Sequence, residues 1–286
     1  MGSLTEPTIQ VNADLGKPAT VLIEKISDAV GGYLKPWQMR RVAKAERDVT
    51  LIAACTQLEV SELERRALGR FLAEEARRQA NIEAITYRAL PMLENDVDPN
   101  LVEDDWIVRF FDRCRLVSDD EVQLLWSRLL AGEVNNPGSY SMRTLDLLQS
   151  MDKSDALQFS ALCRFSLEFG ELTPVIFDLD ATIYRENGLK FDTIRHLGDV
   201  GLISIADHGY LTGGLPESFS VRYGELTLVL EFEKPSHNEI ATGNVLLSRA
   251  GRELASICRT EPIPELPAYL VQEWTRRGYR VSLSSA

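Results

Sequence analysis

The chain of 286 residues has few of the features that mark membrane, secreted or metal-bound proteins. Its apolar runs are far shorter than the roughly 20 residues that a membrane-spanning helix needs. Its first residues, MGSLTEPTIQVNADLG, lack the basic start and apolar core of a signal peptide. The four cysteines have no paired spacing, which indicates free thiols in a reducing compartment and not a disulfide framework. These absences favour a cytoplasmic protein.

Catalytic signatures are also missing. The sequence has no HExxH, no paired CxxC, no phosphate loop ending in Gly-Lys-Ser/Thr and no GxSxG elbow. No cysteine stands at ligand spacing from any of the three histidines, His196, His208 and His237. Asp178 and Asp180 resemble the carboxylate pair of a phosphotransfer site, but loop or helix-capping roles are favoured because no phosphate-binding loop accompanies them. We therefore predict no enzyme activity and no cofactor or metal site.

The net charge of −12 is distributed unevenly along the chain. Residues 1–93 carry 13 basic and 12 acidic side chains, whereas residues 94–160 carry 6 and 14 and residues 161–286 carry 12 and 17. An acidic surface repels phosphate backbones, so nucleic acid is disfavoured as a partner.

Residues 1–36 are predicted to form a flexible lead and a short amphipathic helix that ends at Gly31 and Gly32. A basic stretch with one aromatic follows. An apolar helix face beside an aromatic and several cations is typical of an interfacial membrane anchor. The same pattern fits apolar side chains, Leu22, Ile26 and Trp37, that fold back on the long helix as core. We favour this internal or subunit packing, and a membrane surface stays open as an alternative. The candidate interaction surface comprises Trp37, Arg40, Arg41, Lys44 and Arg47.

Residues 37–93 are predicted to form a long charged helical arm. From Trp37 to Leu90 there is no proline and a single glycine, Gly69, and apolar residues recur at helical spacing between charged runs such as ELERR and EEARR. The arm is either one helix or two helices joined near residues 59–61. A narrow apolar stripe on a charged helix usually packs against a partner helix. We predict a homo-oligomer formed through this arm, with an unknown protein as a further partner.

Residues 94–170 are predicted to form a helical bundle. One helix begins near Asp104, and Ser118 opens a capping box for the next. Ser141 caps a third helix, and a fourth runs from Lys153 to about Phe169.

Residues 171–286 are predicted to form a winged-helix-like α+β domain. A helix over 191–200 passes at Gly201 into a strand, a hairpin follows over 219–232, and a short strand at 245–247 precedes a helix capped by Ser248. A helix over 266–277 and a strand over 279–283 close the domain. The fold class is therefore mainly α with a C-terminal α+β part.

The first of these helices is the candidate recognition helix of the winged-helix-like domain. It offers Lys190, Arg195 and His196 against Asp192 and Asp199. Recognition helices normally present several cationic or amide side chains on a positive surface. A protein-binding or structural role is therefore favoured over reading DNA.

Two parts of the chain carry a family resemblance. They are KPATVLIEKISDAVGGYLKPWQMRRVAKAE and FFDRCRLVSDDEVQLLWSRLLAGEVNNPGSYSMRTLDLLQSMDKSDA. Together they resemble an uncharacterised bacterial family of domain-of-unknown-function proteins, with residues 117–155 the most specific part. The order of the helical block, HLGDVGLI and LLSRAGREL is similar, more distantly, to abortive-infection alpha-type proteins, which are associated with defence against phage. The resemblance implies a cytoplasmic prokaryotic protein with a defence role and carries over no catalytic residues.

The function predicted from these patterns is that of a non-enzymatic interaction or sensor protein in bacterial anti-phage defence of the abortive-infection type. Two alternatives stay open. One is a DNA-binding winged-helix regulator, and the other is an effector that acts at the periphery of the inner membrane through residues 15–47.

Overall fold

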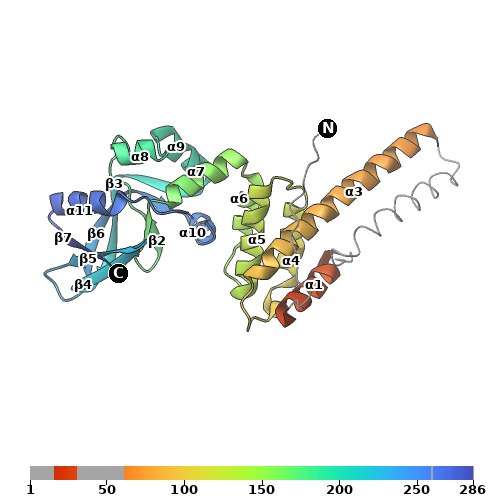
Figure 1. Cartoon of the computed structure of the whole chain (residues 1–286). Helices are drawn as coiled ribbons and strands as arrows, with labels where there is room; N and C mark the ends of the chain where they lie inside the picture. Colours follow the sequence, from red (N-terminus) through yellow and green to blue (C-terminus); the bar gives the residue numbers. More distant parts are fainter. Residues whose placement is uncertain (1–15, 31–60, 259, 286) are drawn as a thin grey trace, which may run out of the picture. The chain divides into compact units, whose positions relative to one another are not determined.

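The computed structural model describes residues 16–30, 61–258 and 260–285, and every structural statement below refers to them. This part of the chain is about 54% helix and 20% strand, with ten α-helices and small antiparallel sheets (Figure 1). The fold is α+β. The chain divides into two compact units, one comprising Met1–Leu116 and Leu130–Pro137 and the other Val117–Leu129 and Gly138–Ala286.

Unit 1 is helical, and α3 is its longest element (Figure 1). A reciprocal capping box fixes the beginning of α3, because the Ser61 hydroxyl accepts from the Glu64 N–H at 3.3 Å and the Glu64 carboxylate accepts from the Ser61 N–H at 2.8 Å. The elements of unit 1 are α1 (Lys17–Val30), α3 (Glu62–Ala89), η1 (Leu90–Met92), η2 (Pro99–Leu101), α4 (Asp104–Cys114) and the last part of α5 (Asp120–Asn135).

The core of unit 1 forms around α4 and the final turns of α3. Trp106 and Phe110 stack with ring centroids 5.1 Å apart, and both are buried. The predicted amphipathic helix is α1, and its apolar residues Leu22 and Ile26 are fully buried. It packs against η2 and α4.

Unit 2 contains seven of the described α-helices, counting the first part of α5. The helix predicted to follow Ser118 exists, but its N-cap is Asp119, whose carboxylate accepts from the N–H groups of Glu121 and Val122 at 3.0 and 3.2 Å. A carboxylate is the better acceptor at the positive end of a helix. The other helices are α6 (Met142–Ser150), α7 (Lys153–Cys163), α8 (Thr182–Glu186), α9 (Phe191–Val200), α10 (Arg249–Ala255) and α11 (Leu266–Arg276).

The prediction that α7 runs to about Phe169 is wrong, because the helix ends at Cys163. Residues 165, 167 and 169 are apolar and buried, and apolar residues at every second position are the pattern of a strand. They belong to β1 (Ser166–Glu168) and its flanks, which reverse at Gly170 (φ +84°) and pair with β2 (Leu172–Pro174). The left-handed φ of Gly170 favours glycine at this turn.

The other strands form a ribbon of order β3-β6 and a sheet of order β4-β5-β7, both antiparallel. The hairpin predicted over 219–232 is confirmed as β4 and β5, whereas the short strand predicted at 245–247 is the end of a longer β6. Ile176 joins β6 beside Gly243, donating to Thr242 O at 3.0 Å and accepting from Asn244 N at 2.9 Å. The strands are β3 (Ile203–Leu215), β4 (Ser218–Tyr223), β5 (Leu226–Glu231), β6 (Asn238–Leu247) and β7 (Arg280–Ser285).

Large aromatic side chains fill the core of unit 2 and anchor its loops. Tyr184 is fully buried, and its hydroxyl donates to Val175 O at 2.9 Å. Trp274 of α11 is also fully buried, and its indole N–H donates to Ala241 O of β6 at 2.8 Å. These bonds satisfy the polar ends of the two rings within the core.

None of the helices in the described ranges is both long enough and apolar enough to span a bilayer.

Candidate functional site

The candidate surface formed by Trp37, Arg40, Arg41, Lys44 and Arg47 lies outside the described residues. Helix α1, which precedes it, is described. Because Leu22 and Ile26 are buried against other parts of unit 1, they are not available to a lipid surface. In this part of residues 15–47 the packing is internal, as favoured, but the partners of α1 are η2 and α4 and not mainly the long helix that we expected.

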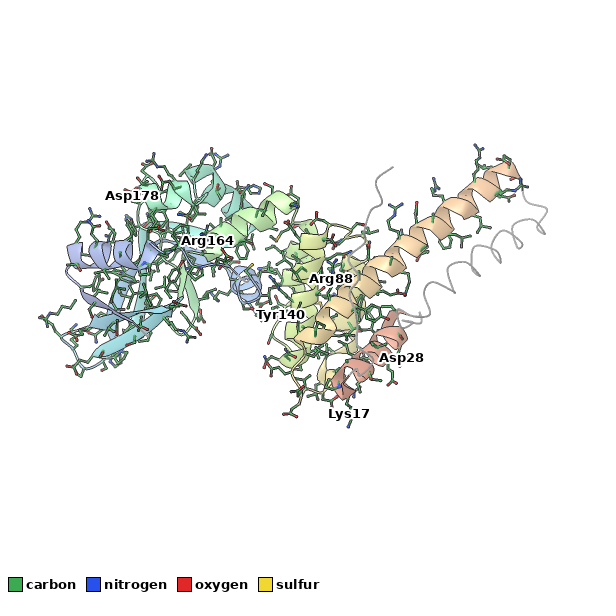
Figure 2. All side chains as sticks on the ribbon, in the orientation of Figure 1. Lys17, Asp28, Arg88, Tyr140, Arg164 and Asp178 are labelled. Carbon is green, nitrogen blue, oxygen red and sulfur yellow. The ribbon has the colours of Figure 1, made fainter. Side chains whose placement is uncertain are left out.

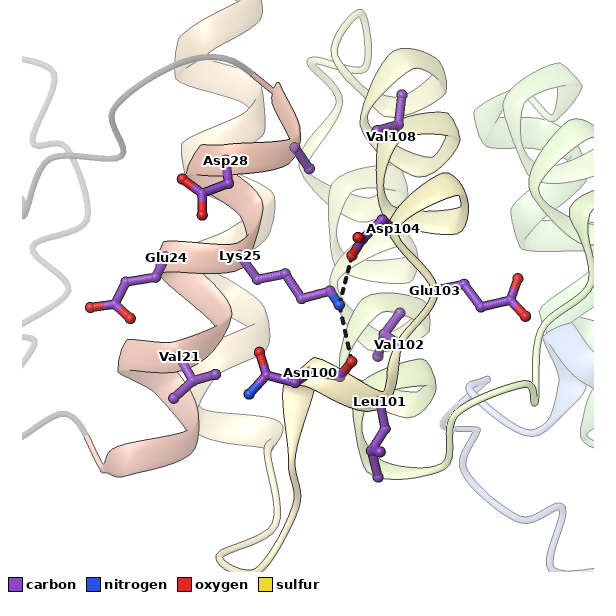
Figure 3. A pocket seen from close by; sticks show the side chains of 11 residues that line it. Val21, Glu24, Lys25, Asp28, Asn100, Leu101, Val102, Glu103, Asp104 and Val108 are labelled. Atoms are coloured by element: carbon purple, nitrogen blue, oxygen red, sulfur yellow. Dashed lines mark hydrogen bonds and ion pairs between the residues drawn. The ribbon is translucent and has the colours of Figure 1, made fainter.

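A hollow of about 840 Å³ lies where α1 meets η2 and the beginning of α4 (Figure 3). The Lys25 ammonium crosses it, lying 2.9 Å from the Asp104 carboxylate and donating to Asn100 O at 3.2 Å. The Lys25 side chain is 12% exposed and that of Asp104 is 87% exposed, so solvent screens the pair and limits its strength. Its polar contacts hold α1 to the segment that opens α4. Further carboxylates line the rim, from Glu24, Asp28 and Glu103.

No group of three or more His, Cys, Asp or Glu side chains is arranged to hold a metal ion in the described ranges. Asp178 and Asp180 are both exposed, and the Asp180 N–H donates to the Asp178 carboxylate at 3.0 Å. This bond from a side chain to the backbone two residues on is a turn of the kind that aspartate favours. The pair therefore has the loop role that the sequence favoured.

The candidate recognition helix of the sequence is α9. Lys190 occupies its N-cap, and both Lys190 and Arg195 are exposed. His196 Nε2 lies 2.6 Å from the Asp155 carboxylate on α7, so this imidazole is engaged within unit 2. The same aspartate closes the capping box at the beginning of α7, accepting from Asp152 N at 3.0 Å. Of the three predicted residues, Lys190 and Arg195 are therefore exposed cations, and His196 is paired with Asp155.

The exposed face of α9 also carries opposite charge and an aromatic ring. Asp192 and Asp199 are exposed, while Ile194 and Leu197 hold the helix to the core. Phe191 is 67% exposed, which the sequence pattern alone did not predict. The sequence could have indicated this residue, because Phe191 is apolar but lies outside the apolar face that Ile194 and Leu197 form on the same helix. A mixed-charge surface with an exposed aromatic suits contact with protein better than readout of base edges.

The first two thirds of α3 form the most extended candidate surface in unit 1. No side chain from Glu62 to Ala80 is buried, whereas burial begins at Asn81. Leu63 is 69% exposed and Phe71 is 56% exposed. The hydrogen bond from the Ser61 hydroxyl, aided by its backbone N–H, holds the pKa of Glu64 below its usual value. We call residues 62–80 the α3 arm.

Ion pairs along the α3 arm stiffen it without burying it. Each ion pair at a spacing of three or four residues stabilises the helix by roughly a few tenths of a kcal/mol. They are Arg65–Glu62 at 3.4 Å, Arg66–Glu62 at 3.9 Å, Arg70–Glu74 at 3.8 Å, Arg78–Glu74 at 3.9 Å and the Arg78–Glu75 contact. These ion pairs support the helix from Glu62 to Ala80, in which no side chain is buried.

Comparison with protein families gives a match over most of the chain. A family model described as a protein of unknown function (DUF2806) matches residues 65–270, which is more than half of the chain. The chain belongs to the DUF2806 family. The DUF2806 match begins inside the α3 arm and ends inside α11, so it takes in parts of both units. The domain-of-unknown-function family predicted from the sequence is confirmed at this level. Comparisons with curated proteins and with solved structures found no match.

Proposed function

We propose that this DUF2806 protein is a non-enzymatic interaction protein that assembles by parallel pairing of the α3 arm with a second copy. The observation that carries the proposal is an exposed apolar stripe on the described helix. Leu63, Ala67 and Phe71 are spaced four residues apart, so they follow one side of α3, and all three are exposed. An exposed stripe of this kind on a long charged helix is typical of an interface between helices.

The charges beside the stripe favour a second copy in parallel orientation. At 3.6 residues per turn, Arg66, Arg70 and Arg77 follow one edge of the stripe, and Glu64 and Glu75 follow the other. In a parallel pair the left edge of one helix meets the right edge of its partner, so the basic edge would meet the acidic one. An antiparallel pair would place like charges together. Partners of a single charge sign would be repelled by one of the two edges.

The assembly is tested with charge and apolar variants of the full chain. Light scattering on a dilution series should show an oligomer that Leu63→Glu with Phe71→Glu dissociates, because two carboxylates would enter the apolar stripe. Arg66→Glu with Arg70→Glu should weaken the assembly, and adding Glu64→Arg with Glu75→Arg should restore it. Ala73→Glu is the matched control, since it adds one carboxylate to the same helix away from the stripe. A monomer for the wild type at micromolar concentration would refute the proposal.

We further propose that the assembly acts in bacterial defence against phage. The support is the order of the helical block, HLGDVGLI and LLSRAGREL, which resembles abortive-infection alpha-type proteins. Cells that express the wild type should show fewer phage plaques than cells that express the Leu63→Glu, Phe71→Glu double variant. Equal plaque counts for the wild type and the double variant would show that the assembly has no role in defence.

A winged-helix-like regulator is the second candidate, favoured by the order of elements in unit 2. Helices α7, α8 and α9 precede β3, which pairs with β6, and Ile176 bonds to β6 from the segment before α8. This order resembles that of a winged helix with β4 and β5 inserted between the two strands of the wing, and the resemblance is what supports this candidate. The exposed carboxylates of Asp192 and Asp199 on α9 would repel the phosphates of DNA. We therefore propose that this unit binds a protein and not DNA.

A DNA-binding assay separates these two uses of unit 2. At 150 mM salt we expect no sub-micromolar affinity for duplex DNA, because the acidic surface repels the phosphates. Tight binding that Arg195→Ala abolishes would instead support the regulator. The comparison variant is Arg222→Ala, which removes an exposed cation from β4.

A further inference from the structure

The hollow between α1, η2 and the beginning of α4 has apolar walls. Val21 and Ala29 line it from α1, and Leu101 and Val108 line it from the other side (Figure 3). Leu101 is 67% exposed and Val108 is 46% exposed. None of the lining residues belongs to the α3 arm, so this surface is distinct from the one that the proposed assembly uses. We call it the α1–α4 groove.

Carboxylates flank the α1–α4 groove on both sides. Asp28, labelled in Figure 2, lies four residues after Glu24, so both are on one side of α1. Glu103 and Asp104 lie across the groove at the beginning of α4 (Figure 3). All four residues are exposed. Within the described part of the chain, the carboxylates of Glu24, Asp28 and Glu103 form no ion pair.

The Lys25 ammonium does not cancel this negative charge. It is held by the Asp104 carboxylate at 2.9 Å and by Asn100 O at 3.2 Å, and the Lys25 side chain is only 12% exposed. The lining residues carry four carboxylates and one ammonium, which gives them a net charge of −3. A partner that approaches the groove therefore meets an apolar wall between two acidic edges.

We propose that the α1–α4 groove binds a cationic amphipathic helix of a partner protein. Apolar side chains on one face of that helix contact Val21, Leu101 and Val108, as in complexes in which a helix lies in an apolar groove. Lysine or arginine side chains along the two edges of that face reach the carboxylates on α1 and at the beginning of α4. The same carboxylates repel nucleic acid and anionic lipid.

The size of the hollow fits side chains of a partner and not a folded domain. Its volume of about 840 Å³ falls within the range of roughly 300–1,000 Å³ that is usual for ligand pockets. The apolar contacts inside it would supply affinity, because they remove Leu101 and Val108 from water. The exposed carboxylates would supply selectivity for a cation, and this part of the binding should weaken as the salt concentration rises.

The test uses the full chain and a labelled synthetic peptide of about 15 residues, the length at which an isolated helix begins to form. The peptide carries leucines along one face and lysines elsewhere, and its fluorescence anisotropy should show saturable binding at 150 mM salt. A peptide of the same composition, scrambled so that the leucines share no face, should bind at least about tenfold more weakly. A peptide with glutamate in place of lysine should not bind. Equal binding of the scrambled peptide would reveal only a general attraction to an acidic protein, and the proposal would be wrong.

Charge variants place the binding in the α1–α4 groove. Glu24→Gln with Asp28→Asn should weaken binding of the leucine–lysine peptide by about fivefold to tenfold, because one acidic edge is lost. Glu94→Gln with Asp96→Asn is the matched control, since it removes the same two charges from exposed positions of unit 1 outside the groove. The control should change the affinity by less than about twofold, because its charges are distant and screened. Equal losses in the two variants would overturn the assignment.

An apolar-wall variant tests the other half of the proposal. Val108→Lys places a cation among the apolar contacts and should abolish binding of the peptide. Thr20→Lys adds the same charge to an exposed position of α1 outside the lining and should bind almost as the wild type does. Both replaced side chains are exposed, so circular dichroism should show the same helix content in both variants. Binding by Val108→Lys at the wild-type affinity would show that the peptide does not lie in the groove.

Discussion

Glu253 lies on α10, but its carboxylate is used at the beginning of α6. One oxygen accepts from Ser141 N at 2.7 Å and from the Thr144 hydroxyl at 2.5 Å, and the other accepts from Arg249 Nε at 2.9 Å. Burial is the largest single influence and raises the pKa of Glu253, but the hydrogen bonds from Thr144, Ser141 and Arg249 together hold that pKa below its usual value. The carboxylate thus replaces the side-chain cap that Ser141 does not make.

Replacing this carboxylate should change how stability depends on pH. Since the folded pKa is lowered, the ionised group stabilises the fold above its unfolded pKa, and this contribution is lost as the pH falls through the folded pKa. Glu253→Gln should lower the free energy of unfolding at pH 7 by about 1–3 kcal/mol. The difference from the wild type should shrink near pH 3. Urea unfolding at pH 7 and at pH 3 measures the difference in unfolding free energy, with Glu225→Gln at an exposed position as control. A difference that is the same at both values would contradict the assignment.

Ile26 tests the internal packing of α1. The side chain is fully buried, so Ile26→Asp would place a carboxylate among apolar groups without a partner. We expect a loss of about 3 kcal/mol or more and a lower melting temperature by calorimetry. Thr20→Asp adds the same charge to the exposed side of α1 and should leave the melting temperature nearly unchanged. Salt-sensitive binding to anionic vesicles, with an unchanged melting temperature for Ile26→Asp, would instead support the membrane alternative.

Among the elements, β6 depends on a glycine that touches another backbone segment. A Cβ on Gly243 would lie 1.8 Å from Ile176 O, and the φ of +99° also disfavours other residues. Gly243→Ala should therefore break the bridge to Ile176 and destabilise the protein by about 2–4 kcal/mol. Gly214→Ala in β3 isolates the backbone strain, because Gly214 has φ +77° and open space around it. It should cost about 1 kcal/mol in thermal or urea unfolding. Equal losses would show that the close approach is unimportant.

Local patterns in the sequence predict much of the fold. The helix–glycine–strand passage at α9 and the Ser248 cap of α10 follow from residues near in sequence, and both are found. The extent of β3 does not follow from local pattern, since its 13 residues show no regular alternation of buried apolar and exposed polar side chains and are fixed by pairing with β6. The end of α7 does not follow from the helix signals, because the capping box at Asp152 marks only its beginning and the strand period after Cys163 extends over a few residues only.

The candidate site shows the same division between local and distant contacts. The charged α3 arm follows from the sequence pattern of residues 62–80. The pairing of His196 on α9 with Asp155 on α7 depends on a contact between two helices far apart in the chain. No spacing in a single sequence encodes such a contact.

At the scale of the whole molecule, neither unit is one continuous stretch of chain. Helix α5 contributes residues 120–129 to unit 2 and residues 130–135 to unit 1. A cut at any single peptide bond in this region therefore leaves at least one unit without part of its own core. Point variants of the full chain leave the cores of both units complete.

Strand β7 has a consequence for synthesis on the ribosome. It is made after the other described strands, yet it pairs with β5, which lies in the middle of its sheet. Until residues 280–285 emerge, β5 offers a free edge with the apolar alternation LTLVLE, and such edges template aggregation. A chain stopped after Gly278 should therefore sediment as aggregate when translated in vitro. A soluble product would show that β5 is protected in some other way.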